Sequence, residues 1–290
     1  MLKILHFSDL HFGPPYLPHI GKAFLEIAPE IEADVLVCSG DFTQRAKEEQ
    51  FQDAQGFLQK LPKLPLIVVP GNHDVPLYRV IERFNTPLDL YKKYISKDLD
   101  DVVEVPGATF VALNSTSPRR AISNGRIHRD QLLFTKSAFD EAPEENIRIL
   151  VAHHHFCPAP DFEKDQVMPQ AKRAINMFSQ LGVELILGGH LHRAYIGNSL
   201  DVYPGKFRNR GIIIVQCGTT TSRRGRGRER EKNSFNVIQI DDQTVHVAHY
   251  MYFNERETFA PISRHIFPRP GHAFLEGEVP MLEKHLVEEL

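Results

Sequence analysis

Short apolar segments recur along this chain, and polar motifs directly follow several of them. The segments lie at 2–7, 35–38, 66–69, 147–152, 184–187 and 212–215. Several are rich in Val and Ile, as buried strands are. Stretches with apolar residues at helical spacing separate the early ones, at 20–31 and 47–61. Strands that alternate with helices in this way form a mostly parallel sheet with the helices outside it.

The second half of the chain has a different pattern. It predicts a hairpin at 102–113 and a helix at 128–142. After Gly189 the chain becomes rich in strands, at 194–196, 212–215, 235–240 and 245–253. A turn at 241–243 joins the last two strands. A sheet of parallel strands followed by a run of late strands predicts two sheets packed face to face, with helices on the outside, and hence an α/β fold.

The last part of the chain is interrupted by prolines, at positions 261, 268, 270 and 280. Proline lacks the backbone N–H that helices and central strands use, so no long element is expected there. A short helix is predicted at 281–290. The expected organisation is therefore one domain at 1–253 and a C-terminal extension at 254–290 that packs on the body or on a partner.

The composition excludes several classes of protein. With 42% hydrophobic and 24% charged residues, the 290-residue chain resembles an ordinary globular protein rather than a disordered one. No apolar run reaches the ~18 residues of a membrane helix, and no secretory signal is visible. The net charge of −3 gives no basic excess for nucleic acid. Three scattered cysteines favour buried or free thiols and a cytoplasmic location.

Polar motifs stand where five of the apolar segments end. They are Asp9-Leu10-His11, Gly40-Asp41, Gly71-Asn72-His73-Asp74, His153-His154-His155 and Gly189-His190-Leu191-His192. The first three recur at intervals of about one βαβ unit. Because the carboxyl ends of parallel strands meet at one edge, where open α/β sheets bind ligands, we expect the motifs to converge there. Their glycines permit positive φ and a close approach of the backbone.

This edge supplies seven nitrogen or oxygen donors and no thiolate. They are Asp9, His11, Asp41, Asn72, one histidine of the run 153–155, His190 and His192. A single zinc ion needs only three or four ligands, so seven donors indicate two metal ions about 3.5–4 Å apart with one carboxylate between them. The mixture of imidazole and carboxylate favours Mn, Fe, Zn or Co over Mg or Ca.

The order of these motifs resembles that of the calcineurin-like metallophosphoesterases, and most of all their class III cyclic-nucleotide phosphodiesterase branch. The shared pattern is Asp-x-His, Gly-Asp, Gly-Asn-His-Asp, His-His and Gly-His-x-His, which spans residues 9–192 here. The resemblance covers 1–253. It implies a four-layer αββα sandwich of two mixed β-sheets flanked by helices, in agreement with the fold class predicted above.

The resemblance also implies roles for the seven donors. The first metal ion would be held by Asp9, His11 and His192, and the second by Asn72, His190 and a histidine of the run 153–155. Asp41 would bridge them. Family members usually show His-His-Pro, with the first histidine as the ligand. We predict His153, which follows the strand directly, with His154 and His155 as alternatives. The expected cofactors are two divalent or trivalent ions (Mn²⁺, Fe²⁺/Fe³⁺ or Zn²⁺).

The implied reaction is hydrolysis of a small phosphodiester, with 3′,5′-cyclic AMP as the named candidate. A hydroxide between the two metals would attack phosphorus in line. Protein phosphatases of the superfamily carry Gly-Asn-His-Glu and a Gly-Asp-x-Val-Asp-Arg-Gly block, from which Asp74 and residues 40–46 depart. Protein dephosphorylation is therefore disfavoured. The alternatives are a DNA or RNA nuclease, a promiscuous phosphomonoesterase and a non-catalytic binding protein of the same fold.

Two further groups of residues are candidates for substrate chemistry. His73 follows the expected ligand Asn72, and the resemblance implies that it contacts the substrate or donates a proton to the leaving group. Asp74 would orient it or cap the next segment. Five arginines within 223–230 form either an exposed loop or a surface that gathers anions. Candidate substrate residues are His154, Arg223 and Arg224. The expected partner is a small diester, with nucleic acid as a partner only in the nuclease alternative. No membrane is expected, and the protein is expected to be a monomer or a homodimer.

Overall fold

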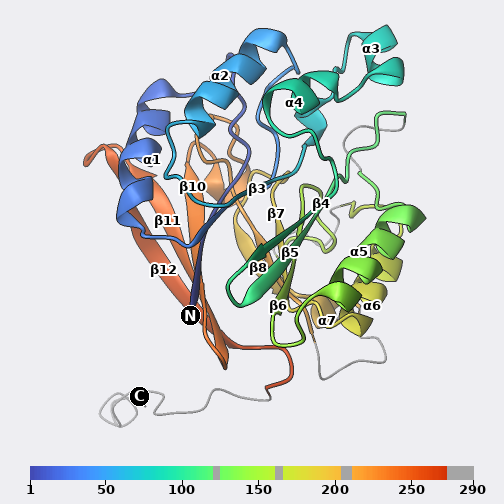
Figure 1. Ribbon diagram of the computed structural model, residues 1–290. Coiled ribbons are helices and arrows are strands. Elements are labelled where there is room, and N and C mark those ends of the chain that lie inside the picture. The colour runs from blue at the N-terminus through green and yellow to red at the C-terminus, as the bar shows by residue number, and fades with distance from the viewer. Residues whose placement is uncertain (120–124, 161–165, 204–210, 273–290) are drawn as a thin grey trace, which may run out of the picture.

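The computed structural model describes residues 1–119, 125–160, 166–203 and 211–272, which form two six-stranded β-sheets packed face to face (Figure 1). Apolar side chains from both sheets, including Ile4, Val37, Val151 and Leu187, fill the space between them. Helices cover the two outer faces (Figure 1). The predicted α/β fold, with two mixed sheets flanked by helices, is thus confirmed.

The first sheet combines parallel and antiparallel strands. Its spatial order is β12 (Thr258–Pro268), β11 (Thr244–Phe253), β10 (Ser234–Ile240), β1 (Leu2–Phe7), β2 (Val35–Cys38) and β3 (Leu66–Val68). β1, β2 and β3 are parallel, whereas β10 pairs antiparallel with β1 and β11. The carboxyl ends of the three parallel strands therefore share one edge.

The second sheet has the same mixed character. Its spatial order is β4 (Asp101–Val105), β5 (Ala108–Leu113), β6 (Ile147–Ala152), β7 (Leu185–Gly188), β9 (Ile213–Gln216) and β8 (Tyr195–Asn198). β5, β6, β7 and β9 are parallel. β4 and β5 form the hairpin that the sequence predicted.

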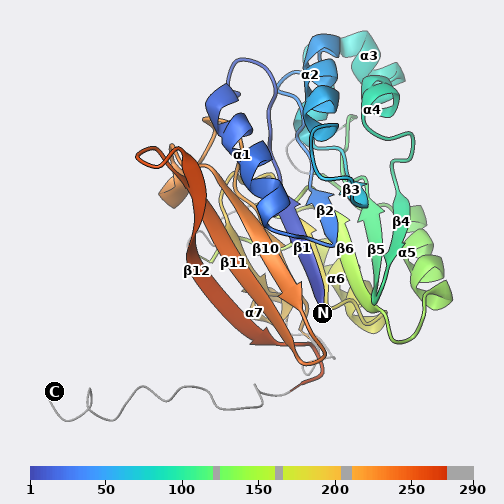
Figure 2. The same cartoon turned by 60° about the vertical axis from the view of Figure 1, so that its left-hand side comes forward.

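The helices follow the same two-sided arrangement. α1 (Pro18–Glu30) and α2 (Glu48–Leu58) cover the first sheet, and α5 (Arg129–Glu141) and α6 (Ala171–Gln180) cover the second (Figures 1 and 2). Shorter elements are α3 (Val80–Asn85), α4 (Asp89–Tyr94), α7 (Ser199–Val202) and 3₁₀ turns at Asn72–Asp74 and Gly227–Glu229.

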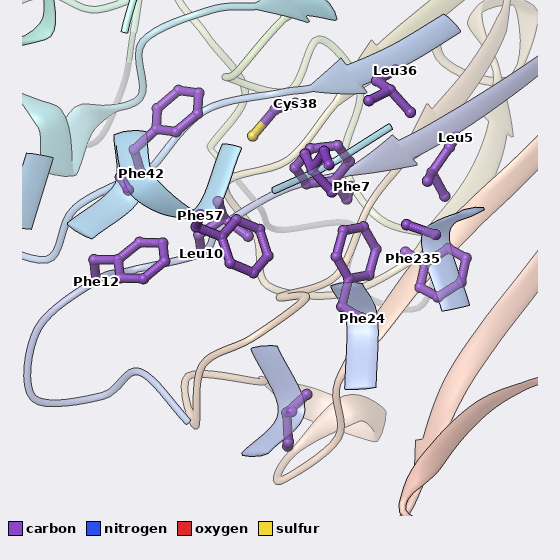
Figure 3. Packing of buried hydrophobic residues seen from close by; sticks show 14 of the residues in the cluster. Leu5, Phe7, Leu10, Phe12, Phe24, Leu36, Cys38, Phe42, Phe57 and Phe235 are labelled. Carbon is purple, nitrogen blue, oxygen red and sulfur yellow. The ribbon is translucent and has the colours of Figure 1, made fainter. Parts of the chain in front are cut away.

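Aromatic packing anchors the strand that carries the first motif. Phe24 of α1 lies between Phe7 at the end of β1 and Phe235 at the start of β10, with ring centroids 5.0 and 5.2 Å from its own (Figure 3). All three side chains are fully buried. Burying each phenyl ring contributes on the order of 1.5–3 kcal/mol. This packing therefore fixes the position of the end of β1 and of Asp9, which follows it.

The first sheet continues beyond residue 253. β12 lies in the segment predicted as a separate extension, and it pairs antiparallel with β11 to form the outer edge of the sheet. Pro261 and Pro268 are compatible with this position because an edge strand leaves half of its backbone N–H groups unpaired. The first described part of the predicted extension is therefore a strand of the first sheet. The helix predicted at 281–290 lies outside the described residues.

Two expectations from composition can be compared with the fold. Within the described ranges, no helix has both the length and the apolar character needed to cross a bilayer. Cys38, Cys157 and Cys217 are all buried and unpaired, as the sequence predicted.

Candidate metal centre

The predicted ligands lie where parallel strands of both sheets end. The first sheet supplies Asp9 and His11 after β1, Asp41 after β2 and Asn72 after β3, whereas the second supplies His153 after β6 and His190 and His192 after β7. The backbone N–H of His190 donates to Asp9 Oδ2 across the gap between the sheets, at 3.0 Å. The two sheets therefore build one centre together.

Four of these side chains form a tight group. Asp9, His11, Asp41 and His192 each offer one ligand atom, and these atoms all lie within 4.8 Å of one another. His192 Nε2 lies 3.1 Å from Asp9 Oδ1, and His11 Nε2 lies 3.6 Å from the same oxygen. The four side chains are buried. Two carboxylates and two imidazoles are a donor set typical of a divalent transition metal.

A second group lies against the first and shares Asp41 with it. Asn72 Oδ1 lies 2.8 Å from His190 Nδ1 and 3.2 Å from His153 Nε2. His153 Nε2 is also 3.4 Å from Asp41 Oδ2, and His11 Nε2 approaches the same oxygen to 3.7 Å. The carboxylate of Asp41 thus faces both groups, which is the position of a bridging ligand.

The carboxylate oxygens at the middle of the centre fit a cation. Asp9 Oδ1 and Asp41 Oδ2 are buried and accept no hydrogen bond from the part of the chain that the structure describes. A buried, ionised oxygen without a partner is strongly unfavourable, and a metal ion between such oxygens removes the penalty. The residues present therefore fit the pair of metal ions that the sequence predicted.

Backbone carbonyls orient two of the histidine rings. His153 Nδ1 donates to the carbonyl oxygen of Ser39 at 2.7 Å, and His192 Nδ1 donates to that of Arg224 at 3.0 Å. Because a carbonyl oxygen only accepts, the proton sits on Nδ1 and the lone pair of Nε2 is left for the centre. The sequence analysis missed both contacts, since any residue can supply a backbone carbonyl.

Five of the ligands stand on a strained backbone. Asp9, His11, Asp41, His190 and His192 have φ values of 55°, 52°, 56°, 74° and 53°. Residues other than glycine rarely adopt this left-handed conformation, and it persists only where the surrounding structure imposes it. Here the loops hold one another, since Asp9 N donates to Gly40 O and His11 N to Asp41 O.

Two motif glycines are required by close approach, as predicted. Gly40 has φ +102°, and a Cβ there would lie 2.6 Å from His153 Nδ1. A Cβ at Gly71 would overlap the carboxylate of Asp41. A side chain at either position would displace a ligand.

The protonation states suit metal binding. Burial raises the pKa of Asp9, but the nearby imidazoles of His192 and His11 outweigh this effect, so the pKa of Asp9 lies below its ordinary value. Burial lowers the pKa of His11 to about 3, although the two aspartates oppose the shift. At neutral pH Asp9 is therefore ionised and His11 is neutral, which are the forms that bind metals. Burial also lowers the pKa of His153, but the charge of Asp41 outweighs it and raises that pKa to about 9, so a metal ion bound there would displace a proton.

His73 lies at the rim of the centre beside Arg224. Its backbone N–H donates to Asp41 Oδ1 at 2.7 Å, and its Nδ1 donates to the carbonyl oxygen of Gln44 at 3.0 Å. Arg224 Nη1 donates to Gln44 Oε1 at 2.8 Å and lies 3.5 Å from His73 Nδ1. Burial lowers the pKa of His73. Gln44, which the sequence analysis missed, thus brings the predicted catalytic and substrate residues together.

Asp74, which the sequence analysis expected to orient His73 or cap the next segment, accepts hydrogen bonds from the backbone of two ligand loops. Its Oδ2 accepts from the backbone N–H groups of Gly71 and Phe42, at 2.9 and 3.3 Å, and its Oδ1 from that of Thr43 at 2.9 Å. The side chain is buried. Asp74 therefore ties the loop of Asn72 to the loop of Asp41, away from the reacting atoms.

The structure gives the remaining candidates other contacts. Among the three consecutive histidines, His153 contacts both Asp41 and Asn72 through its Nε2. His154 Nδ1 lies 2.8 Å from Ser115 Oγ, and the ring of His155 stacks on that of His190 with centroids 5.6 Å apart. Arg223 is exposed, and its Nη2 donates to the carbonyl oxygen of Pro14.

Several solved structures share the fold at low sequence identity. A purple acid phosphatase from yellow lupin seeds has TM-score 0.66 and 11% identity, over 92% of this chain and 53% of that one. This chain thus spans about half of the lupin protein. A dimetal phosphatase from Danio rerio has TM-score 0.60 and 11% identity, over 92% and 98%. GAP50, the anchor in the inner membrane complex of Plasmodium, has TM-score 0.59 and 14% identity, over 94% and 90%.

Sequence comparison identifies the family. No curated protein matches the chain significantly. A family model described as Calcineurin-like phosphoesterase matches residues 2–194. That range holds all seven side chains that form the candidate metal centre and ends just after His192. The chain therefore belongs to the calcineurin-like phosphoesterase family.

Proposed function

We propose that this metallophosphoesterase is a phosphodiesterase that acts on small diesters, with 3′,5′-cyclic AMP as the first candidate to assay. The observation that carries the proposal is the position of Asp41. Its Oδ2 faces His11 of one group and His153 of the other, at 3.7 and 3.4 Å. One carboxylate shared by two donor groups is the arrangement of a two-metal hydrolase. Mn, Fe and Zn are the metals that suit these ligands.

The charge of the loaded centre favours a diester. Two divalent cations bring +4, Asp9 and Asp41 bring −2, and a hydroxide brings −1. A centre of about +1 matches a phosphodiester monoanion better than a monoester dianion. When bound, the metal pair would lower the pKa of a water molecule and neutralise charge on the phosphoryl oxygens.

The protein's own groups at the rim would handle the substrate. His73 holds a proton on Nδ1 through Gln44, which leaves Nε2 as the nitrogen that can take up a proton and return it to the leaving oxygen. The guanidinium of Arg224, held by the same glutamine, supplies positive charge beside that ring. Both groups favour a transition state in which negative charge grows on oxygen.

The main competing function is phosphomonoester hydrolysis. It is supported by the lupin and Danio rerio proteins of the same fold, both of which are phosphatases by name. A nuclease and a catalytically inactive binding protein are the remaining alternatives, the latter because GAP50 is described as an anchor. An inactive protein is disfavoured because all seven ligand positions are filled.

Three unpaired thiols support a reducing, cytoplasmic location.

The test is hydrolysis by the metal-reconstituted protein. The substrates are bis(p-nitrophenyl) phosphate, p-nitrophenyl phosphate, 2′,3′- and 3′,5′-cyclic AMP and single-stranded DNA, each with Mn²⁺ and after chelation. We expect chelator-sensitive turnover of diesters to exceed that of the monoester. The Asp41→Asn variant, checked for folding by circular dichroism, is the control. Preference for the monoester, or activity confined to DNA, would replace the proposal with the corresponding alternative.

A further inference from the structure

One short segment beside the catalytic rim exposes an unusual amount of apolar surface. Ten large apolar side chains are exposed on the part of the chain that the structure describes, and five of them fall within residues 77–84. These five, here called the apolar segment, are Leu77, Tyr78, Val80, Ile81 and Phe84. Tyr78 is 73% exposed and Ile81 79%. Neighbouring apolar side chains left in water mark a site that binds something apolar.

The apolar segment is attached to the loop that holds the catalytic rim. The guanidinium of Arg45 lies over the ring of Tyr78, 5.1 Å from its centroid. Arg79 Nη2 donates to the carbonyl oxygen of Ala46 at 2.7 Å. Arg45 follows Gln44, the residue that holds His73 and Arg224. In Figure 2, α3 lies at the end of the molecule toward which β1 and β2 run.

Positive charge surrounds the same segment. Arg45 lies over Tyr78, Arg79 lies within the segment and donates to the carbonyl oxygen of Ala46, and Arg83 Nε donates to the carbonyl oxygen of Pro118 from within α3. Glu82 pairs with Arg79 at 2.7 Å. A guanidinium that lies over the apolar segment and directly follows Gln44, which holds Arg224 at the rim of the centre, complements a molecule with an anionic phosphate at one end and an apolar chain at the other. A protein partner that docked on the apolar segment would not need the segment to be connected to the metal centre through Arg45 and Gln44.

We propose that the apolar segment binds the alkyl chain of a phosphodiester whose phosphate enters the metal centre. The preferred substrates are then amphiphilic diesters of the lysophospholipid kind. This inference rests on the proposed phosphodiesterase function and narrows its substrate class. The alkyl chain would lie along Tyr78 and Ile81, and the phosphate beside Arg224 and His73.

A homologous series of substrates tests the inference. Alkyl 4-nitrophenyl phosphates with methyl, butyl and octyl groups share one leaving group and differ only in chain length. Half-burial of each added methylene strengthens binding about twofold, so kcat/KM for the octyl ester is expected to exceed that for the methyl ester on the order of 100-fold. The Tyr78→Ser, Ile81→Asp double variant should reduce this ratio to below about tenfold. Leu133→Asp, at an exposed position on α5, is the matched control and should keep the wild-type ratio.

The outcomes separate this inference from the function on which it rests. Hydrolysis of the methyl ester without any rise along the series would overturn the inference alone. Failure to hydrolyse any ester would overturn the proposed function. A double variant that sediments differently from wild type but keeps its ratio would show that the segment joins two copies of the chain, which also overturns the inference.

A binding measurement provides a readout that needs no turnover. The chain contains no tryptophan, so Tyr78→Trp introduces a single reporter on the apolar segment. Dodecyl phosphate, added below its micellar concentration, should shift the emission of this variant to shorter wavelength, whereas methyl phosphate should not. Leu133→Trp is the control and should not respond. An unchanged spectrum of the Tyr78→Trp variant with dodecyl phosphate would overturn the inference.

Discussion

The Nε2 atoms of His11 and His192 lie 2.9 Å apart in the interior of the metal centre. His192 commits its Nδ1 proton to the carbonyl oxygen of Arg224, so the lone pair of its Nε2 points toward His11 and Asp9. Both imidazoles are buried. Two imidazole nitrogens held this way, with an unpartnered carboxylate oxygen beside them, are suited to bind a metal cation.

The two donor groups should therefore be separable by metal content. We expect the His192→Ala and His153→Ala variants each to lose about one of two metal equivalents, because each removes a ligand from a different group. Asp41→Asn should weaken both sites, because its carboxylate faces both. The measurement is mass spectrometry of metals after dialysis, with the exposed His265→Ala as control. Equal loss of both metals from every variant would contradict the division into two groups.

His73 should be needed for turnover but not for metal. We expect the His73→Ala variant to lose about 10²- to 10⁴-fold in kcat, the range typical of a positioned acid–base group. Its metal content should match wild type, because its ring nitrogens are not among the ligands. Steady-state kinetics and metal analysis of one preparation check this, with His19→Ala at an exposed position as control. Loss of metal in parallel with activity would show that His73 supports the centre instead.

Asp74 should contribute strongly to the stability of the fold. Removing its carboxylate leaves the buried N–H groups of Gly71 and Thr43 without an acceptor. We expect the Asp74→Ala variant to lose about 2–4 kcal/mol of unfolding free energy in urea. The control is Asp140→Ala, whose carboxylate pairs with Lys136 on the exposed face of α5 and should change stability by less than about 0.5 kcal/mol. Similar losses in the two variants would refute the assigned role.

The buried His6 should make the metal-free protein sensitive to acid. Burial lowers the pKa of His6 to about 3, and the charge of Asp9 opposes the shift without reversing it. The unfolded chain binds a proton on His6 near pH 6.5, whereas the folded chain binds it only near pH 3. The free energy of unfolding therefore has its full value above pH 6.5 and falls as the pH is lowered from 6.5 toward 3. Between these values the free energy of unfolding should fall by up to about 1.36 kcal/mol per pH unit more in wild type than in His6→Gln. Urea melts from pH 7 to pH 4.5 in chelator measure this difference, and the partly exposed His246→Gln should keep the wild-type slope.

The sequence contains the information for the strands and ligands but not for the supports around them. Asp9, Asp41 and Asn72 could be predicted because each follows an apolar run, and parallel strands must end at a common edge. His153 could be preferred over its neighbours for the same reason. Ser39 and the main chain of Gln44 act through carbonyl oxygens, which no residue type reveals. The role of Asp74 depends on a contact with Thr43, 31 positions earlier, that only the folded chain creates.

The strand β12 shows a different limit of sequence patterns. Pro261 and Pro268 argued against a regular element in the last part of the chain, and that rule holds for central strands. At the edge of a sheet the penalty disappears, because a proline whose nitrogen faces away from the neighbouring strand breaks no ladder hydrogen bond. Whether a strand lies at an edge is a property of the whole topology, which could not be read from local spacing.

Because the ligands come from both sheets, the centre joins segments that are 181 positions apart in the chain, such as those of His11 and His192. Bringing such distant segments together is entropically unfavourable until each sheet has formed and the two have docked. Metal binding must then come after the main folding barrier. Contacts made after the barrier slow unfolding and leave the folding rate nearly unchanged. Bound metals would therefore slow unfolding without speeding folding, so that the loaded protein would stay folded for longer.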